Sequence, residues 1–342
     1  MLAIAALALV LALAFTFTNG FQNAGAMAAT FITSRSASPR QGIVLVSAMS
    51  FAGALLGGTA VALTVATLLT LPPEDELVWI VLLALLSAAL WNLLAWRYGM
   101  PASSTHGLIG GLIGAGVASA GIASIDWGVQ ELLSPDPHLE GVVKVVFFLV
   151  VTVLVGFVGG YALRATTRLM LRGASRAANR TIVGVNWVAA AAMAFTSGAN
   201  DAQKQMGVIA LILFAAGLSA DLAVPPWARF GCAALLALGI LSGGWRVMAT
   251  LGRRIFRILP VHSLDSQVSS GAIIAFATVA GAPVSTTQVI STSVIGVGAA
   301  ENPLKMRWLV GTQILVTMFV TIPATACLAA LLHLALGPFM GY

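Results

Sequence analysis

Charged side chains are scarce in this sequence. Only 8% of its 342 residues are Asp, Glu, Lys or Arg, whereas 59% are hydrophobic, and a soluble domain carries about 25% charged residues. Because a charge is costly in hydrocarbon, so deep a depletion places most of the chain inside a membrane. The apolar runs are long rather than short and alternating, which predicts helices and argues against a β-barrel. We therefore expect an all-α, multi-pass integral protein of the cell membrane.

The sequence also lacks the motifs of most catalytic and nucleotide-driven proteins. Its two cysteines, Cys232 and Cys327, lie inside apolar runs, so neither a disulfide framework nor a cysteine metal site is predicted. No phosphate-binding loop of the Gly-x-x-x-x-Gly-Lys-Ser/Thr type is present, and no nucleophile–base or metal-ligand constellation. These absences argue against ATP-driven transport by this chain alone and against an enzyme.

The basic residues, which give the chain a formal net charge of +6, lie in short loops between the apolar runs. Loops rich in Lys and Arg stay in the cytoplasm, so we interpret them as topology signals rather than as a nucleic-acid-binding face. Basic loops near Arg35, Arg97 and 164–180 alternate with acidic ones at 74–76 and 126–140. This order predicts an odd number of crossings in the first half, so the second half starts on the opposite side of the membrane.

Six apolar runs are the plainest candidates for spanning helices, which need about 20 residues each. They are Leu2–Phe17, Ile43–Leu71, Leu77–Trp96, Val142–Leu163, Cys232–Leu251 and Trp308–Leu336. At about 30 residues per span and loop, the chain has room for about 10 crossings, and we expect about 10–12 membrane segments.

Two motifs occur twice, in the same order. Residues 20–24 (Gly-Phe-Gln-Asn-Ala) resemble 198–202 (Gly-Ala-Asn-Asp-Ala), and residues 101–106 (Pro-Ala-Ser-Ser-Thr-His) resemble 283–288 (Pro-Val-Ser-Thr-Thr-Gln). The motifs start 81 residues apart in the first half and 85 in the second. With odd crossings per half, this predicts two inverted-topology repeats, 1–172 and 173–342. That architecture is typical of secondary transporters, with the binding site between the repeats near mid-membrane.

The second motif predicts a helix that starts inside the membrane. Proline is favoured in the first turn of a helix, and Ser or Thr caps that end. Such a start presents free amide groups and the positive end of the helix dipole, which together form an anion site. The alternative is an ordinary spanning helix whose hydroxyls bond to their own backbone. Two copies in register, each after a proline, favour the anion site and broken or re-entrant helices. The sequence leaves open whether 101–122 and 283–300 cross the membrane fully or re-enter it.

The second copy of the first motif, with the residues just after it, places two charged side chains inside an apolar segment rather than in a loop. Asp201 and Lys204 lie within an apolar segment, and a charge at membrane depth is by default a functional candidate. The alternative is a structural pair one helical turn apart. We expect Gly20 and Gly198 to let their helices break and expose carbonyl groups that ligate a small cation. His106, whose counterpart is Gln288, is expected to be a hydrogen-bonding residue rather than a proton relay.

At these residues the sequence resembles the inorganic phosphate transporter (PiT) family, over nearly its whole length. The resemblance rests on Phe17–Asn23, Ser34–Arg40, Pro101–His106, Gly198–Gly207 and Pro283–Gln288. It implies a symporter that moves inorganic phosphate with sodium or a proton, in contact with membrane lipid. It implies no cofactor apart from a bound sodium ion. A homodimer is compatible with the sequence.

The resemblance also implies the site residues. Phosphate is expected at Asn23, Ser103, Ser104, Thr105, Asn200, Asp201, Ser285, Thr286 and Thr287. The coupling cation is expected at Asp201, Asn23, Gln22, Asn19 and Asn200.

The first half departs from the family's usual Phe-Asp-Phe-x-Asn-Gly-Phe-His-Asp-x-Ala-Asn-Ala. Thr16 and Asn23 replace its two acids, Gln22 its histidine and Ala26 its second asparagine. Each lost carboxylate removes a cation ligand or a proton acceptor. This leaves sodium and proton coupling both open. It also leaves two alternative functions, a sulfate permease of the same fold and a non-coupled channel or sensor.

Overall fold

The computed structural model describes residues 2–98, 103–175, 177–243, 257–306 and 308–337. Its helices are α1 (Leu2–Thr33), α2 (Pro39–Leu56), α3 (Ala60–Ala66), α4 (Asp75–Tyr98), α5 (Ser104–Ala120), η1 (Ile122–Ser124), α6 (Val129–Leu132), α7 (Gly141–Met170), α8 (Ala178–Ala215), α9 (Pro226–Ser242), α11 (Pro260–Val279), α12 (Thr286–Glu301), η2 (Pro303–Lys305) and α13 (Trp308–Leu336). In the described ranges the only β-structure is an isolated bridge between Leu69 and Ile125.

The helices confirm an all-α membrane protein. Within the described residues, six helices are long and apolar enough to cross a membrane: α1, α2, α4, α7, α8 and α13. The shorter α9 is also apolar. The expected span 232–251 begins within α9, which ends at Ser242, and its part from residue 244 lies outside the described residues.

The expected single span Ile43–Leu71 is wrong, because the chain breaks between α2 and α3. Gly58 adopts a φ of 82°, which an L side chain rarely tolerates. The Gln203 side chain spans the break: its amide donates to the Gly57 carbonyl (2.8 Å) and its oxygen accepts from the Val61 amide (2.9 Å). A broken helix is tolerated at membrane depth only where such partners satisfy the freed backbone groups.

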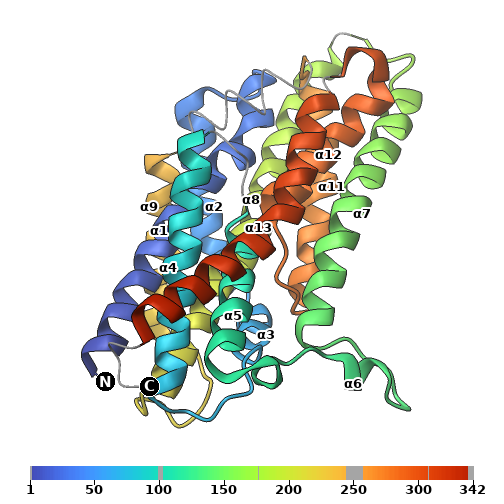
Figure 1. Ribbon diagram of the computed structural model, residues 1–342. Helices are drawn as coiled ribbons and strands as arrows, with labels where there is room; N and C mark the ends of the chain where they lie inside the picture. Colours follow the sequence, from blue (N-terminus) through green and yellow to red (C-terminus); the bar gives the residue numbers. More distant parts are fainter. Residues whose placement is uncertain (1, 99–102, 176, 244–256, 307, 338–342) are drawn as a thin grey trace.

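Packing between the halves is reciprocal. Helix α1 packs against α9 as α2 packs against α8, and α5 packs against α13 as α12 packs against α7. In Figure 1, α1 begins at the end of the molecule marked N, whereas α8 begins at the opposite end, next to the end of α7. This is the arrangement that an inverted repeat requires. The boundary between 1–172 and 173–342 stays a prediction, and extensive contacts cross it.

Gly20 and Gly198 do not break their helices, which corrects the expectation from sequence. Helix α1 is continuous through Gly20, and α8 through Gly198. Both positions instead allow close helix approach. A Cβ atom at Gly20 would lie 2.2 Å from the Leu236 carbonyl oxygen of α9, and one at Gly198 would lie 2.2 Å from the Ser50 carbonyl oxygen of α2. Small residues at helix crossings in membranes serve this purpose.

The substitution Gly198→Ala should therefore lower the free energy of unfolding by about 1–3 kcal/mol through overpacking. Gly184, on the same helix, has no atom within 4 Å of an added Cβ. Gly184→Ala should leave stability unchanged or raise it by about 0.5–1 kcal/mol. Thermal unfolding of the detergent-solubilised variants measures both. Equal unfolding temperatures for the two variants would contradict the packing role of Gly198.

Candidate functional site

Two short helices begin inside the protein at the repeated Ser/Thr motifs. Ser103 is the N-cap of α5, and its hydroxyl accepts from the His106 amide (3.3 Å). Ser285 is the N-cap of α12, without a side-chain capping bond. These helices have 17 and 16 residues, fewer than the roughly 20 that a full crossing needs. The helix starts thus lie where the motifs predict them.

Pro283 does not occupy the first turn of α12. Pro283 lies two residues before the N-cap of α12, outside the helix, so that detail of the prediction is wrong. Pro101 lies outside the described residues.

Residues at matching positions of the two repeats touch each other at this site. The Asn23 side-chain amide donates to Asp201 Oδ2 (2.8 Å), and these residues occupy the same place in the first motif. His106 Nδ1 lies 3.2 Å from Gln288 Nε2, and these occupy the same place in the second motif. Both contacts join residues 1–172 to residues 173–342, so the site lies between the two predicted repeats.

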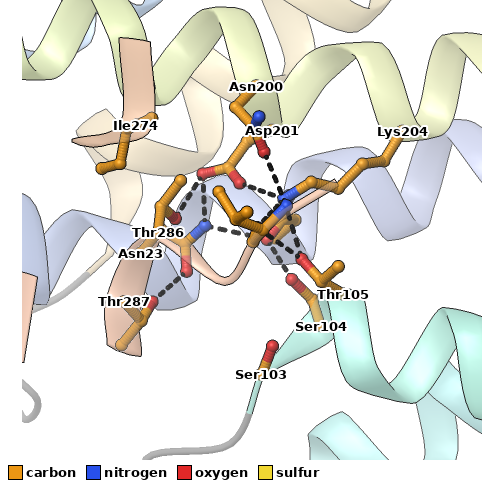
Figure 2. Close-up of polar contacts among 12 residues, drawn as sticks. Asn23, Ser103, Ser104, Thr105, Asn200, Asp201, Lys204, Ile274, Thr286 and Thr287 are labelled. Atoms are coloured by element: carbon orange, nitrogen blue, oxygen red, sulfur yellow. Dashed lines mark hydrogen bonds and ion pairs between the residues drawn. The ribbon is translucent and has the colours of Figure 1, made fainter. Parts of the chain in front are cut away.

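Asp201 stands at the centre of the polar cluster, 1% exposed (Figure 2). Its Oδ2 accepts from Asn23 and from the Thr286 hydroxyl (2.9 Å), and its Oδ1 accepts from Lys204 Nζ (2.8 Å). Three charge-assisted hydrogen bonds compensate for burying the carboxylate. Helices α1, α8 and α12 each supply one of the donors.

Lys204 joins the two helix starts. Its Nζ donates to Asp201 Oδ1, to the Thr105 hydroxyl (2.8 Å) and to the Val284 carbonyl (2.6 Å). An ammonium group has three donors, so all of them are used. The structural pair considered from the sequence therefore exists, and it lies inside the cluster (Figure 2). The prediction of site residues omitted Lys204, although its place one turn after Asp201 was the available signal.

A second group of contacts ties α1 to both helix starts. Asn19 Oδ1 accepts from Ser104 Oγ (2.5 Å) and from Asn23 Nδ2 (3.0 Å). Asn23 Oδ1 accepts from Thr287 Oγ1 (2.8 Å). The structure thus brings Asn19, Asn23, Ser104 and Thr287 into one hydrogen-bonded network.

Two expected residues have other contacts. Asn200 donates to the Thr278 hydroxyl and the Ala282 carbonyl (3.0 Å each) and accepts from the Val284 amide (3.2 Å), so it holds the segment before α12 in place. Gln22 is half-buried and donates to the Asn92 carbonyl (3.3 Å), rather than to the cluster.

Buried polar atoms without a partner among the described residues lie beside the same network. They are Asn19 Nδ2, His106 Nε2 and Gln288 Oε1. Each unmade hydrogen bond of a buried group costs about 1–3 kcal/mol. A ligand with both acceptors and donors, bound between the helix starts, would satisfy such groups.

The cluster combines donors for an anion with one compensated carboxylate. Hydroxyls from both helix starts and the two dipole ends favour negative charge. Asp201 and Lys204 contribute opposite charges, which leaves the cluster formally neutral. No group of three or more His, Cys, Asp or Glu suited to a metal ion occurs within the described ranges.

The fold and this buried cluster are those of a multi-pass membrane transporter. Comparison with known families matches the phosphate transporter family to residues 19–183 and 171–329. The chain belongs to that family.

Curated relatives are similar in sequence to this chain along nearly its whole length. It is 36% identical over 334 residues to a "probable low-affinity inorganic phosphate transporter" of Bacillus subtilis (strain 168), which covers 97% of this chain and 96% of the relative. A protein of the same description from Rhizobium meliloti (strain 1021) is 35% identical, with 95% and 94% covered.

A solved structure shares the fold. It is titled "The sodium-dependent phosphate transporter" and superimposes with a TM-score of 0.82 at 21% identity, covering 98% of this chain and 99% of that one. At that identity the likeness shows the fold alone. The resemblance seen in the sequence is thus confirmed, while the roles of the individual site residues stay predictions.

The substitutions Thr105→Ala and Thr287→Ala should each weaken phosphate binding by about 1–3 kcal/mol, because each removes a hydroxyl from one helix start. Equilibrium binding of radiolabelled phosphate to the purified variants measures the effect. Thr64→Ala is the control, since the exposed Thr64 hydroxyl bonds only to its own helix (3.4 Å to the Ala60 carbonyl). Unchanged binding in both site variants would contradict a site built from paired helix starts.

Proposed function

We propose that this protein is a secondary active symporter that moves inorganic phosphate across the cell membrane together with a coupling cation. The observation that carries the proposal is the convergence of the starts of α5 and α12 on one buried carboxylate–ammonium pair. The relatives described as inorganic phosphate transporters support phosphate as the anion, rather than sulfate.

Phosphate would bind between Ser103–Thr105 and Ser285–Thr287. The hydroxyls of Thr286 and Thr287 now donate to Asp201 and Asn23, and rotation of these hydroxyls would turn them toward a bound anion. Lys204 would supply positive charge beside it. In a low-dielectric site these interactions are stronger than in water.

The coupling cation is sodium or a proton, and it would bind at Asp201. Asn23, which contacts Asp201, and Asn19, which contacts Asn23, would offer further oxygen atoms. Asn200 Oδ1 accepts from the Val284 amide and Gln22 contacts the Asn92 carbonyl, so both side chains would need to turn. The contacts of Lys204 favour the proton. Its ammonium group already lies where a metal cation would sit, among a carboxylate, a hydroxyl and a carbonyl oxygen. Sodium at this position would have to displace Lys204, whereas a proton could join Asp201 directly.

Transport requires the protein to change shape, because the site is closed in this structure. The expected phosphate-binding side chains are each at most 7% exposed. Reciprocal packing of the halves offers the motion, since rocking one repeat against the other would open the site to each side in turn.

Uptake of radiolabelled phosphate into proteoliposomes, under separately imposed sodium and proton gradients and with sulfate as competitor, tests this function. We expect accumulation driven by the proton gradient and resistant to sulfate. Sodium-driven accumulation would still support a symporter, but it would contradict the proton coupling inferred from the contacts of Lys204. Absence of accumulation under both gradients, with phosphate still bound, would favour the channel or sensor, and replacement of phosphate by sulfate would favour the permease.

In the same assay, Asp201→Asn should abolish gradient-driven uptake, because the amide can neither carry the proton nor balance Lys204. Asp221→Asn, in the loop before α9, is the control and should transport normally. Size-exclusion profiles that match the unsubstituted protein would show that folding is intact. Normal uptake by Asp201→Asn would remove Asp201 from the mechanism.

A further inference from the structure

A second positively charged site lies away from the helix starts, where α7 ends. A pocket of about 380 Å³ is lined there by Arg164, Arg168, Leu171, Arg172, Asn179, Ile182, Leu259, Pro260 and Val261. These residues belong to the end of α7 and the beginnings of α8 and α11. The three helix ends lie at the top of Figure 1. All of its charged lining residues are arginines.

Arg164 and Arg168 lie four residues apart on one face of α7, and Arg172 follows in the turn after its last residue, Met170. Arg164 is already neutralised: its Nε lies 2.7 Å from Glu301 Oε2, and its Nη1 lies 3.6 Å from Asp265 Oδ2. Arg168 donates to the Ala300 carbonyl (3.3 Å). Among the described residues, neither Arg168 nor Arg172 forms an ion pair with a carboxylate. Two exposed positive charges therefore remain for an external anion.

The first turn of α11 adds to the positive potential. Pro260 and Val261 line the pocket at the start of α11, where the Leu259 amide donates to His262 Nδ1 (3.2 Å). The first amides of a helix lack partners within the helix, and its dipole favours an anion there. Arginine side chains match the oxygen atoms of a phosphate group in geometry as well as in charge.

The remaining lining indicates which phosphate-bearing molecule binds. Five of the nine lining residues are apolar (Leu171, Ile182, Leu259, Pro260 and Val261). Beside the pocket, Leu169 and Met170 are 60% and 76% exposed at the end of the spanning helix α7. Free phosphate has no apolar group to pack against these side chains, whereas a phospholipid carries both a phosphate group and acyl chains. The basic loop here is predicted to be cytoplasmic, where basic residues near the membrane attract anionic lipid.

We propose that this pocket binds the headgroup of an anionic phospholipid, with Arg168 and Arg172 on the phosphate and the acyl chains along Leu171 and Ile182. The lipid would bridge the end of the first half to α8 and α11 of the second. This site is separate from the transport site and does not depend on the identity of the transported ion.

Native mass spectrometry of the detergent-purified protein tests the proposal, with phosphatidylglycerol or phosphatidylcholine added. We expect the unsubstituted protein to retain phosphatidylglycerol in preference to phosphatidylcholine. Arg172→Gln should reduce the retention of phosphatidylglycerol about fivefold, as expected for one arginine at a membrane surface. Arg180→Gln is the matched control, because Arg180 is exposed in the same basic region but does not line the pocket. Its retention should be unchanged.

Three outcomes would overturn the proposal. Equal retention of the two lipids would exclude selection for anionic headgroups. Equal losses in Arg172→Gln and Arg180→Gln would mean that the basic region as a whole, rather than the pocket, attracts lipid. Displacement of phosphatidylglycerol by inorganic phosphate at the lipid's own concentration would assign the pocket to the free anion.

Discussion

The burial of Asp201 against Lys204, each 1% exposed, is the constraint on which the rest of this structure depends. Taking two charges out of water is expensive, and a well-packed apolar pair would often be as stable or more stable. The pair therefore makes little sense as a stabilising device. It is tolerable only because Asn23, Thr286, Thr105 and the Val284 carbonyl complete the hydrogen bonds of both groups.

These hydrogen-bond partners come from both predicted halves of the chain, so the geometry of the site depends on how the two halves pack together. Asn23 and Thr105 belong to the first half, whereas Asp201 and Thr286 belong to the second. Motion of one half against the other must break some of these hydrogen bonds, and a bound anion and cation can replace them. In the proposed symport, the bound ions would thus lower the cost of the movement that carries them. This is the property that distinguishes a coupled transporter from a channel.

The sequence predicted the fold class and the location of the helix starts because composition and repeated motifs report directly on membrane burial and capping. It did not predict that α2 and α3 are separate, since the break depends on Gln203, which is 142 residues from Val61 in sequence. It misjudged Gly20 and Gly198, because a glycine that allows helices to approach looks the same in sequence as one that breaks a helix. The role of Lys204 depends on the Val284 carbonyl and on Thr105, which only the tertiary structure brings to it.

The most direct test is a structure determined in lipid nanodiscs with phosphate bound. The account predicts phosphate between the starts of α5 and α12, within hydrogen-bonding distance of Thr105 and Thr287, with the contacts of Lys204 rearranged toward it. Phosphate bound elsewhere, with the Asp201–Lys204 pair and both helix starts unchanged, would contradict the account.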